Sequence, residues 1–270
     1  MGAAGMLGRD LMRLAGDDAT GVDIADFDIR DEEATRELVS RARPDVVLNC
    51  AAFTNVDGAE EQEEQALRVN GDGARNAAAA AAQAGAAVLY VSTDYVFDGR
   101  KGAPYVEWDE PAPLSSYGRS KLAGERATAE ANPRHWIVRS SWLFGVGGKN
   151  FVETMLGLER DPIRVVHDQV GSPTFTGHLA PALLEIASGT EHGIHHASAS
   201  GSCSWHDFAR AVFERAGLER NLQSCSTEEY PLPAPRPAFS VLGSEREDPV
   251  RLPSWEEGLD AYLAERGVRA

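Results

Sequence analysis

The sequence is poor in cysteine and has no long apolar run. Its three cysteines, Cys50, Cys203 and Cys225, are odd in number and lack C-x-x-C spacing, which argues against a disulfide framework or a zinc site. No apolar stretch approaches the roughly 20 residues needed to cross a bilayer, and no charged start followed by an apolar block marks a signal peptide. We therefore expect a cytoplasmic protein with reduced cysteines, no metal and no membrane partner.

Positive charge is also scarce. The chain has 26 lysine and arginine residues against 42 aspartate and glutamate residues, which gives a formal net charge of −16. A protein of this sign gains no counterion release from a phosphate backbone, so nucleic acid is excluded as a partner. The chain has only three lysines, Lys101, Lys121 and Lys149, so a functional role can be considered for each of them separately.

The order of apolar segments predicts the fold class. Short apolar runs alternate with helical patterns over about the first 145 residues, which is typical of a parallel sheet covered by helices on both faces. We predict an α/β fold with a Rossmann-like doubly wound parallel sheet. The predicted strands are 19–23, 44–52, 87–93 and 136–142, and the predicted helices are 6–15, 31–42, 59–70, 74–84 and 115–127.

The chain opens on a glycine loop, MGAAGMLGRDL. Gly2, Gly5 and Gly8 have the spacing of a loop that turns into a helix whose free N–H groups hold a pyrophosphate. Asp23 follows Gly2 by 21 residues, close to the offset at which dinucleotide folds place a carboxylate on the adenosine ribose. The alternatives are a loose tail and an ordinary turn. The combination favours a dinucleotide site.

No strand precedes this loop, so the first strand of the sheet is missing at the N-terminus. In a doubly wound sheet that strand is central, and each backbone group left unpaired by its loss costs about 1 to 3 kcal/mol. We therefore expect Met1 to be a misassigned start, preceded in the natural product by about 5 to 8 residues, mostly Val, Ile or Leu.

The segments VSTDYVFDG and SSYGRSKLAGE hold the residues best suited to catalysis. Tyr117 and Lys121 are four residues apart, so their side chains project from one face of a helix. A phenol has a pKa of about 10, and a neighbouring ammonium is expected to lower that pKa toward the working range. A hydroxyl from Ser92 or Thr93 could then hold a carbonyl oxygen while Tyr117 delivers its proton.

These motifs resemble those of one enzyme family. The order of the glycine loop, NCAAFTNVDGAE, STDYVFDG, YGRSKLAGE, RSSWLFG, NFVETML, DQVGSPT, SGSCSWHDFA and PAPRPAFSVL is similar to that of the dTDP-4-dehydrorhamnose reductases, members of the extended short-chain dehydrogenase/reductase superfamily. The resemblance covers nearly the whole chain. It implies hydride transfer from NADPH or NADH to C4 of a dTDP-4-keto-6-deoxy sugar, giving dTDP-L-rhamnose.

The resemblance also implies roles for particular residues. Tyr117 would be the general acid, Lys121 would lower its pKa and bind the nicotinamide ribose, and Thr93 would orient the C4 carbonyl. The cofactor-binding residues would be Gly2, Gly5, Met6, Leu7, Gly8, Asp23, Asp28, Ile29, Ala51, Ala52, Tyr117 and Lys121. The substrate-binding residues would be Thr54, Val56, Asp94, Tyr95, Trp142, Asn150, Gln169 and Arg236, with Arg236 contacting nucleotide phosphate through its fork.

After about residue 145 the predicted loops become longer. Further helices are predicted at 151–159, 178–187, 204–216 and 254–263. We therefore divide the chain into an NAD(P)-binding Rossmann-like domain at 1–145 and a smaller substrate-binding lobe at 146–270, whose chain crosses back to the sheet.

Several alternatives stay open. Asp23, Asp26 and Asp28 would repel a 2′-phosphate and favour NADH, whereas Arg9 could admit NADPH. The alternative functions are a non-catalytic dinucleotide-binding subunit resembling the methionine adenosyltransferase beta subunit, and another nucleotide-sugar reductase or epimerase. The sugar configuration, dependence on a divalent ion and the oligomeric state, with a homodimer as one option, are also open.

Overall fold

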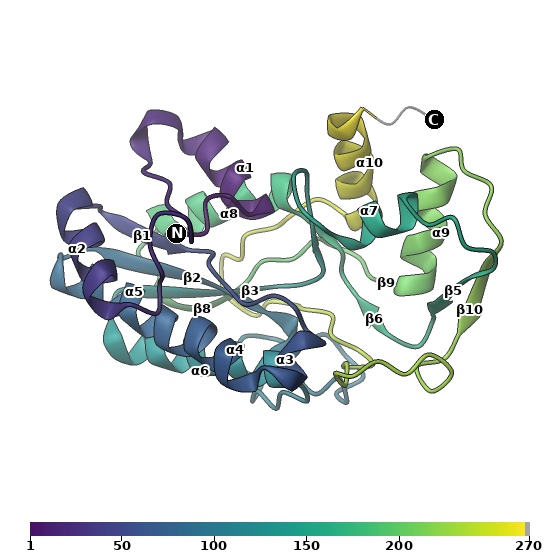
Figure 1. Cartoon of the computed structure of the whole chain (residues 1–270), viewed down its shortest axis with the longest axis horizontal. Helices are drawn as coiled ribbons and strands as arrows, with labels where there is room; N and C mark the ends of the chain where they lie inside the picture. Colours follow the sequence, from purple (N-terminus) through teal and green to yellow (C-terminus); the bar gives the residue numbers. More distant parts are fainter. Residues whose placement is uncertain (268–270) are drawn as a thin grey trace.

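The computed structural model describes residues 1–267, and a parallel sheet forms its centre (Figure 1). The sheet has the order β1–β2–β3–β8. All seven residues of β2 are buried, as expected for an inner strand covered on both faces. The predicted α/β class with a parallel sheet is therefore confirmed. The strands are β1 (Val46–Asn49), β2 (Ala87–Thr93), β3 (His135–Ser140) and β8 (Gly193–His196).

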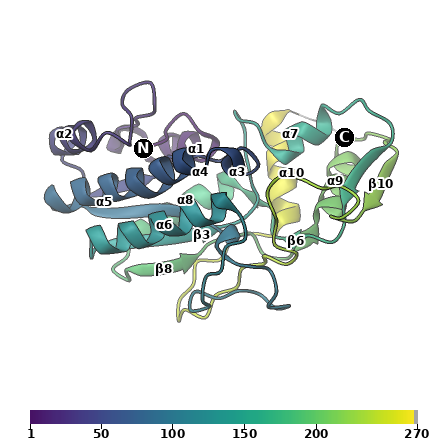
Figure 2. The same cartoon turned by 60° about the horizontal axis from the view of Figure 1, so that its bottom comes forward.

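Helices cover both faces of this sheet (Figures 1 and 2). On one face lie α2 (Glu32–Ala42), α5 (Gly73–Gln83) and α6 (Ser116–Ala131), and on the other lie α1 (Met6–Ala15) and α8 (Thr176–Ser188). Ala77, Ala78 and Ala81 of α5 are fully buried. Because alanine is small and favours helix, this run lets α5 pack closely against the sheet.

Short helical segments connect these layers. The region predicted as one helix at 59–70 is broken into α3 (Gly58–Glu61), α4 (Glu63–Leu67) and a π-helical turn η2 (Arg68–Asp72) that leads into α5. Two 3₁₀ turns follow α1 and β2, namely η1 (Gly16–Asp18) and η3 (Asp94–Val96). The break places Asn70 inside an irregular turn rather than a straight helix.

The second half of the chain adds a smaller lobe beside the carboxyl ends of the strands (Figure 1). Its aromatic core includes Phe144, Phe175, Phe208 and Tyr262. Its helices are α7 (Phe151–Leu156), α9 (Trp205–Arg215) and α10 (Trp255–Arg266), and its strand pairs are β4 (Leu143–Phe144) with β7 (Thr174–Phe175), β5 (Ile163–Val166) with β10 (Leu222–Cys225), and β6 (Val170–Gly171) with β9 (Cys203–Ser204).

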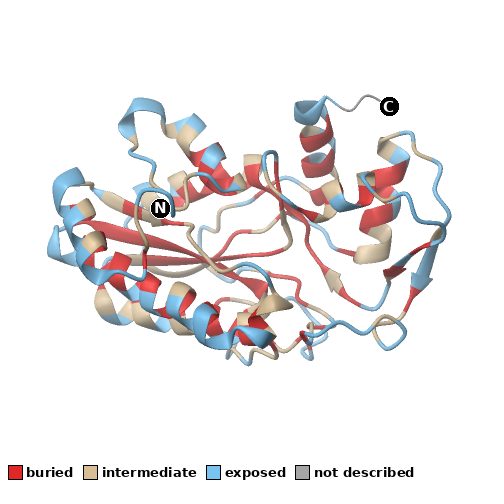
Figure 3. Ribbon diagram, in the orientation of Figure 1, coloured by how far each residue is buried: buried red, intermediate tan, exposed pale blue. Residues whose placement is uncertain are grey.

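Part of this second half returns to the central sheet. Strand β8 pairs in parallel with β3, and α8 packs against α1. Figure 3 shows that the strands of the central sheet and the inner faces of these helices are buried, and Leu179, Leu183 and Ile186 of α8 pack in one cluster with Leu7 and Leu11 of α1. The lobe is therefore anchored to the first half by shared packing, while the boundary at residue 145 stays a prediction.

One predicted strand is absent. Residues 19–23 have no strand structure and are half-buried or exposed, so the strand predicted there was wrong. Among residues 1–267, β1 has β2 as its only neighbouring strand, and its other edge bonds only to Met1. The 19–23 segment therefore has no adjacent strand to pair with, and an extended run without a partner does not form a ladder.

In the part of the chain that the structure describes, no helix is both long enough and apolar enough to span a membrane.

Candidate active site

The first turn of α6 holds Tyr117 against the end of β2. Ser115 caps this helix, because its side chain accepts a hydrogen bond from the Gly118 N–H at 3.1 Å. A Cβ at Gly118 would lie 2.2 Å from the Tyr95 carbonyl oxygen, so only glycine permits this approach. The local sequence SSYG therefore fixes where Tyr117 meets the turn that follows β2.

Lys121 lies one helical turn further along α6 and points into the sheet. Its ammonium donates a hydrogen bond to the Val91 carbonyl at 2.7 Å and lies 4.0 Å from the centre of the Tyr90 ring. The side chain is only 2% exposed. Burial lowers the pKa of Lys121 to about 7, although the nearby Glu125 carboxylate acts to raise it.

Tyr117 is half-buried and meets Tyr95 edge-to-face, with ring centroids 5.9 Å apart. Burial raises the pKa of Tyr117 to about 12, and a hydrogen bond with Thr93 acts to lower it. The expected net lowering by Lys121 is therefore not observed, because loss of water disfavours the phenolate more than its surroundings stabilise it. The phenol is protonated at neutral pH.

The end of β2 separates the two candidate hydroxyls. Ser92 donates to the Glu125 carboxylate at 2.5 Å, whereas Thr93 donates to Asp94 at 3.1 Å and reaches Tyr117. The Ser92 hydroxyl is therefore engaged by Glu125 of α6, and of the two hydroxyls only that of Thr93 is in contact with Tyr117. Asp94 is buried, and its carboxylate also accepts from Ser240 at 2.5 Å.

A fully buried asparagine joins this region to the loop after β1. The Asn70 amide accepts from the Phe53 N–H at 2.8 Å and donates to the Phe53 carbonyl at 3.1 Å and to Ser120 at 2.8 Å. Ser120 in turn donates to the Tyr117 carbonyl at 2.7 Å. Asn70 was not among the predicted site residues, although an asparagine is unfavourable within a helix and its presence there indicates that its side chain forms specific hydrogen bonds.

A cavity of about 480 Å³ collects most of the predicted cofactor residues. A Cβ at Gly2, where φ is +78°, would lie 2.8 Å from the Ala51 nitrogen, and a Cβ at Gly8 would lie 2.1 Å from the Gly2 carbonyl oxygen. Glycines at both positions are therefore required for the loop to form. Of the predicted cofactor residues, this cavity is lined by Gly2, Gly5, Asp23, Asp28, Ile29, Ala51 and Ala52, and Thr54, predicted to bind substrate, lines it as well.

Several predicted cofactor residues lie on or beside the glycine loop and the start of α1. Gly5 caps α1 without a side chain, and no acidic residue lies in the first turn, so the N–H groups there face no competing carboxylate from that turn. Asp23 accepts from the Ala4 N–H at 2.8 Å, and Asp28 is paired with Arg30. The Leu7 side chain packs into the core, whereas the Met6 sulfur lies 3.6 Å from the Asn150 amide nitrogen.

Trp142 adopts an uncommon backbone conformation beside the site. Its φ is +48°, and its ring stacks on that of Trp205 with centroids 3.5 Å apart and planes within 3° of parallel. A Cβ at Gly171 would lie 2.4 Å from the Trp142 ring, so this glycine leaves room for the stack. Trp205 was not among the predicted residues, because only the folded lobe brings it to Trp142.

Other predicted substrate residues are engaged within the protein. Asn150 caps α7 and donates to the Gly145 carbonyl at 2.9 Å, and Gln169 donates to Thr227 at 2.9 Å. Both guanidinium nitrogens at the tip of Arg236 bond to Asp57, at 3.0 and 2.8 Å. The Arg236 fork is therefore bonded to a carboxylate of the protein itself, and its contact with nucleotide phosphate stays a prediction. Val56 is half-buried in the loop that precedes α3.

Within residues 1–267, no group of three or more His, Cys, Asp or Glu side chains has the arrangement of a metal site.

Known proteins resemble this chain over nearly all of its length. Residues 1–267 match the family model described as RmlD substrate binding domain. A spore coat polysaccharide biosynthesis protein, SpsK of Bacillus subtilis, is 42% identical over 98% of this chain and 96% of its own length. A dTDP-4-dehydrorhamnose reductase of Mycolicibacterium smegmatis is 43% identical over 97% of this chain and 84% of its own length.

A solved structure shows the same architecture. The crystal structure of a dTDP-4-dehydrorhamnose reductase from Bacillus anthracis in complex with NADP superposes with a TM-score of 0.94 and 39% identity. The match covers 98% of this chain and 97% of that one.

Proposed function

This chain belongs to the dTDP-4-dehydrorhamnose reductase family, and we propose that it reduces the C4 ketone of dTDP-4-dehydro-6-deoxy-L-mannose, giving dTDP-L-rhamnose, with NADPH or NADH. One observation carries the proposal. The phenol of Tyr117, the hydroxyl of Thr93 and the ammonium of Lys121 gather at the carboxyl end of β2. Ligands of open α/β sheets bind at this end of the strands.

The residues present fit a dinucleotide. Gly2 lets the loop pass close to the Ala51 backbone, and the uncapped start of α1 at Gly5 offers N–H groups and a positive dipole end to a diphosphate. Asp23 lines the same cavity at the position suited to ribose hydroxyls. Cys50, which also lines this cavity, is an electrostatic neighbour of Lys121, so the ammonium lies near the cavity.

A bound nicotinamide supplies the hydride that adds to the ketone carbon. Tyr117 donates its phenolic proton to the oxygen at C4, so that the ketone becomes an alcohol and the phenol becomes a phenolate that water reprotonates. Burial raises the pKa of Tyr117 to about 12, so the phenol carries its proton before the reaction.

Lys121 stabilises the phenolate that forms on Tyr117. The two residues lie on one helix face, and the ammonium is held by the Val91 carbonyl and the Tyr90 ring. Thr93 donates a hydrogen bond to the same C4 oxygen and fixes the direction from which the proton arrives. Both groups act on charge that develops during the reaction, where fixed donors are most effective.

The sugar nucleotide lies against the lobe. Tyr95 and Trp142 present aromatic surface to it, Asp94 and Gln169 offer polar groups, and Thr54, Val56 and Asn150 border the entrance. Arg236 contacts phosphate with Asp57 holding its guanidinium in place. Since several relatives of about 40% identity are reductases, a purely regulatory subunit is not favoured.

The experiment is an assay of NADPH and NADH oxidation with dTDP-4-dehydro-6-deoxy-L-mannose. Tyr117→Phe should lower turnover by roughly two to four orders of magnitude, the usual size of a general-acid contribution, while cofactor binding measured by fluorescence is kept.

Tyr262→Phe is the matched control, because the Tyr262 hydroxyl bonds to Glu153 between helices of the lobe. This variant should keep wild-type turnover. Near-normal turnover in Tyr117→Phe would reject Tyr117 as the acid, and no oxidation of either cofactor by the wild type would reject the reaction itself.

A further inference from the structure

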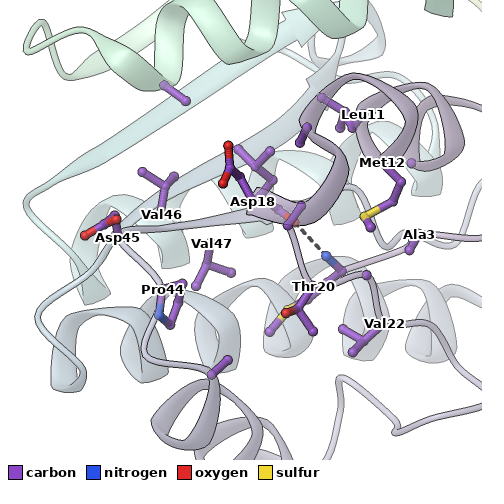
Figure 4. A pocket seen from close by; sticks show the side chains of 18 of the residues that line it. Ala3, Leu11, Met12, Asp18, Thr20, Val22, Pro44, Asp45, Val46 and Val47 are labelled. Carbon is purple, nitrogen blue, oxygen red and sulfur yellow. Dashed lines mark hydrogen bonds between the residues drawn. The ribbon is translucent and has the colours of Figure 1, made fainter.

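Three buried side chains form a chain of hydrogen bonds beside the proposed acid. The Thr93 hydroxyl lies 3.1 Å from one oxygen of the Asp94 carboxyl, and the Ser240 hydroxyl lies 2.5 Å from the other. All three residues are buried. None of them lines the cavity drawn in Figure 4, to which Thr20 and Val46 contribute. The chain of hydrogen bonds therefore links the end of β2 to the second half of the protein.

Backbone contacts fix the position of Ser240. Its N–H donates to the Val170 carbonyl at 2.9 Å, and the Val170 N–H donates to the Ala238 carbonyl at 2.8 Å, so this segment is paired with β6. The loop after η3 also approaches the segment closely, because a Cβ at Gly99, where φ is +77°, would lie 2.7 Å from the Ala238 nitrogen. The Ser240 hydroxyl is therefore held at the Asp94 carboxyl by its surroundings.

The Thr93 hydroxyl has a single proton and so can donate only one hydrogen bond. Its oxygen accepts from the Tyr95 N–H at 3.2 Å, which leaves Asp94 and Tyr117 as its other neighbours. The proposed reaction requires this proton at the oxygen of C4. An ionised Asp94 competes for it, because a carboxylate only accepts hydrogen bonds, whereas a protonated carboxyl can donate to the Thr93 oxygen.

The surroundings of Asp94 favour its protonated form. Its carboxyl bonds to hydroxyls and backbone N–H groups, none of which is charged, and burial raises the pKa of Asp94 to about 7. The titratable side chains that face it are Tyr95 and Tyr117, and burial raises the pKa of both phenols. The charged side chains beside Tyr95 are Asp57 and Arg236, which are paired with each other. Of these groups, only Asp94 changes its charge near neutral pH.

We propose that Asp94 is a positioning residue that sets the direction of the Thr93 hydroxyl, a role that rests on the reductase activity proposed above. When its carboxyl carries a proton, it donates to the Thr93 oxygen, and the Thr93 hydroxyl donates to the oxygen at C4. When the carboxyl is ionised, it accepts the Thr93 proton, and the oxygen at C4 loses one of its two donors. Ser240 bonds to the second carboxyl oxygen and so directs the proton of Asp94 to the oxygen beside Thr93.

The test is the pH dependence of kcat/KM for the sugar nucleotide at saturating reduced cofactor. Asp94→Asn mimics the protonated carboxyl, since its amide can donate to Thr93 while its carbonyl accepts from Ser240. With a pKa of about 7, Asp94 should cost the wild type about tenfold in kcat/KM between pH 6 and pH 8. Asp94→Asn should lack this loss, so its ratio of kcat/KM at pH 6 to that at pH 8 should be about tenfold smaller. Losses that come from Lys121 are common to both proteins.

Two further variants show whether Asp94 acts through Thr93. Thr93→Val removes the hydroxyl that the carboxyl directs, so adding Asp94→Asn in this background should leave the pH dependence unchanged. Ser240→Ala removes a donor that stabilises the carboxylate. The pKa of Asp94 should then rise, and the loss of kcat/KM should move about one pH unit toward alkali.

Ser244→Ala is the matched control for Ser240→Ala. Ser244 lies four residues further along the chain, and its hydroxyl donates to the buried carboxylate of Glu107 at the same distance of 2.5 Å. That carboxylate also accepts from the backbone N–H groups of His196 and Glu245 and is not bonded to Thr93. Ser244→Ala should therefore keep the pH profile of the wild type.

Two outcomes would overturn the role of Asp94 while leaving the reductase activity in place. One is a ratio of kcat/KM at pH 6 to pH 8 that is the same in Asp94→Asn as in the wild type. The other is an effect of Asp94→Asn on this ratio that persists in the Thr93→Val background. No turnover by the wild type would instead reject the reaction, and the role of Asp94 with it.

Discussion

The ammonium of Lys121 lies over the face of the Tyr90 ring, 4.0 Å from its centre. Tyr90 is fully buried in β2, and its hydroxyl donates to the Asn70 carbonyl at 3.1 Å. A Cβ at Gly124 would lie 2.4 Å from this hydroxyl, so the helix approaches closely only because residue 124 is glycine. The ring therefore occupies a fixed place beneath the charge that we assign to the reaction.

Replacing the ring should move the pH profile of turnover. A desolvated cation–π contact is worth about 1–2 kcal/mol, which corresponds to about one pKa unit. Tyr90→Leu removes an interaction that favours the charged form, so the pKa of Lys121 should fall further below its value of about 7. If turnover requires the ammonium, its alkaline limb should shift about one pH unit toward acid.

Tyr90→Phe is the matched control for this shift. It keeps the aromatic face and loses only the hydroxyl, so the pH profile should stay in place while the free energy of unfolding falls by about 1 kcal/mol. Identical pH profiles for Tyr90→Phe and Tyr90→Leu would show that the ring does not act on Lys121.

The ion pair between Glu125 and Arg139 is buried and should respond asymmetrically to substitution. The two side chains are joined by bonds of 2.9 and 2.7 Å, and both are almost fully buried. Arg139→Met leaves the Glu125 carboxylate without its partner and should cost about 3–5 kcal/mol of unfolding free energy, measured in urea. The double variant Arg139→Met with Glu125→Leu should recover part of this loss. A double variant less stable than Arg139→Met would contradict this account.

The sequence pattern correctly predicted those helices and strands that are determined by interactions between neighbouring residues. The helix at 6–15 and the strand at 87–93 were predicted with the observed bounds, because helical periodicity and a bounded apolar run are properties of neighbouring residues. The strand predicted at 19–23 has the same kind of pattern, but a strand exists only where a second strand pairs with it. Its failure was therefore not visible in the segment itself.

The site divides in the same way. Tyr117 and Lys121 could be paired from sequence because a helix fixes residues four apart on one face. Other contacts of the site join positions that are far apart in the chain, namely the stack of Trp142 on Trp205 and the hydrogen bonds of Asn70 to Phe53. No local sequence pattern predicts such contacts. Burial also reversed the expected shift in the pKa of Tyr117, because the degree of solvent exclusion depends on the folded surroundings.

The buried carboxyl of Asp94 should make stability depend on pH. Burial raises the pKa of Asp94 to about 7 from an ordinary value of 3.8. Because the folded state binds this proton more tightly, the contribution is fully present below about pH 4 and is lost as the pH rises through about 7. A shift of this size corresponds to up to about 4 kcal/mol.

Asp94→Asn removes this titration and isolates its effect. The unfolding free energy of the wild type, relative to that of Asp94→Asn, should fall between pH 5 and pH 8, as measured by urea denaturation at several values of pH. Contributions from Lys121 and other titrating groups are common to both proteins and largely cancel in the difference. A difference that is constant over this range would show that Asp94 titrates at its ordinary pKa.

The stack of Trp205 on Trp142 should control the affinity for the sugar nucleotide. Trp142 is held at a φ of +48°, a region that non-glycine residues rarely adopt, and the Trp205 ring lies parallel to it at 3.5 Å. An aromatic pair contributes about 0.5–1.5 kcal/mol beyond its buried area, so Trp205→Ala should raise KM for the sugar nucleotide about three- to tenfold. The kcat and the affinity for NADPH should change little, because Trp205 lies in the lobe, away from Tyr117 and Lys121. Trp205→Phe should recover part of the lost affinity, and an equal loss in kcat would instead place Trp205 among the groups that act on the reaction itself.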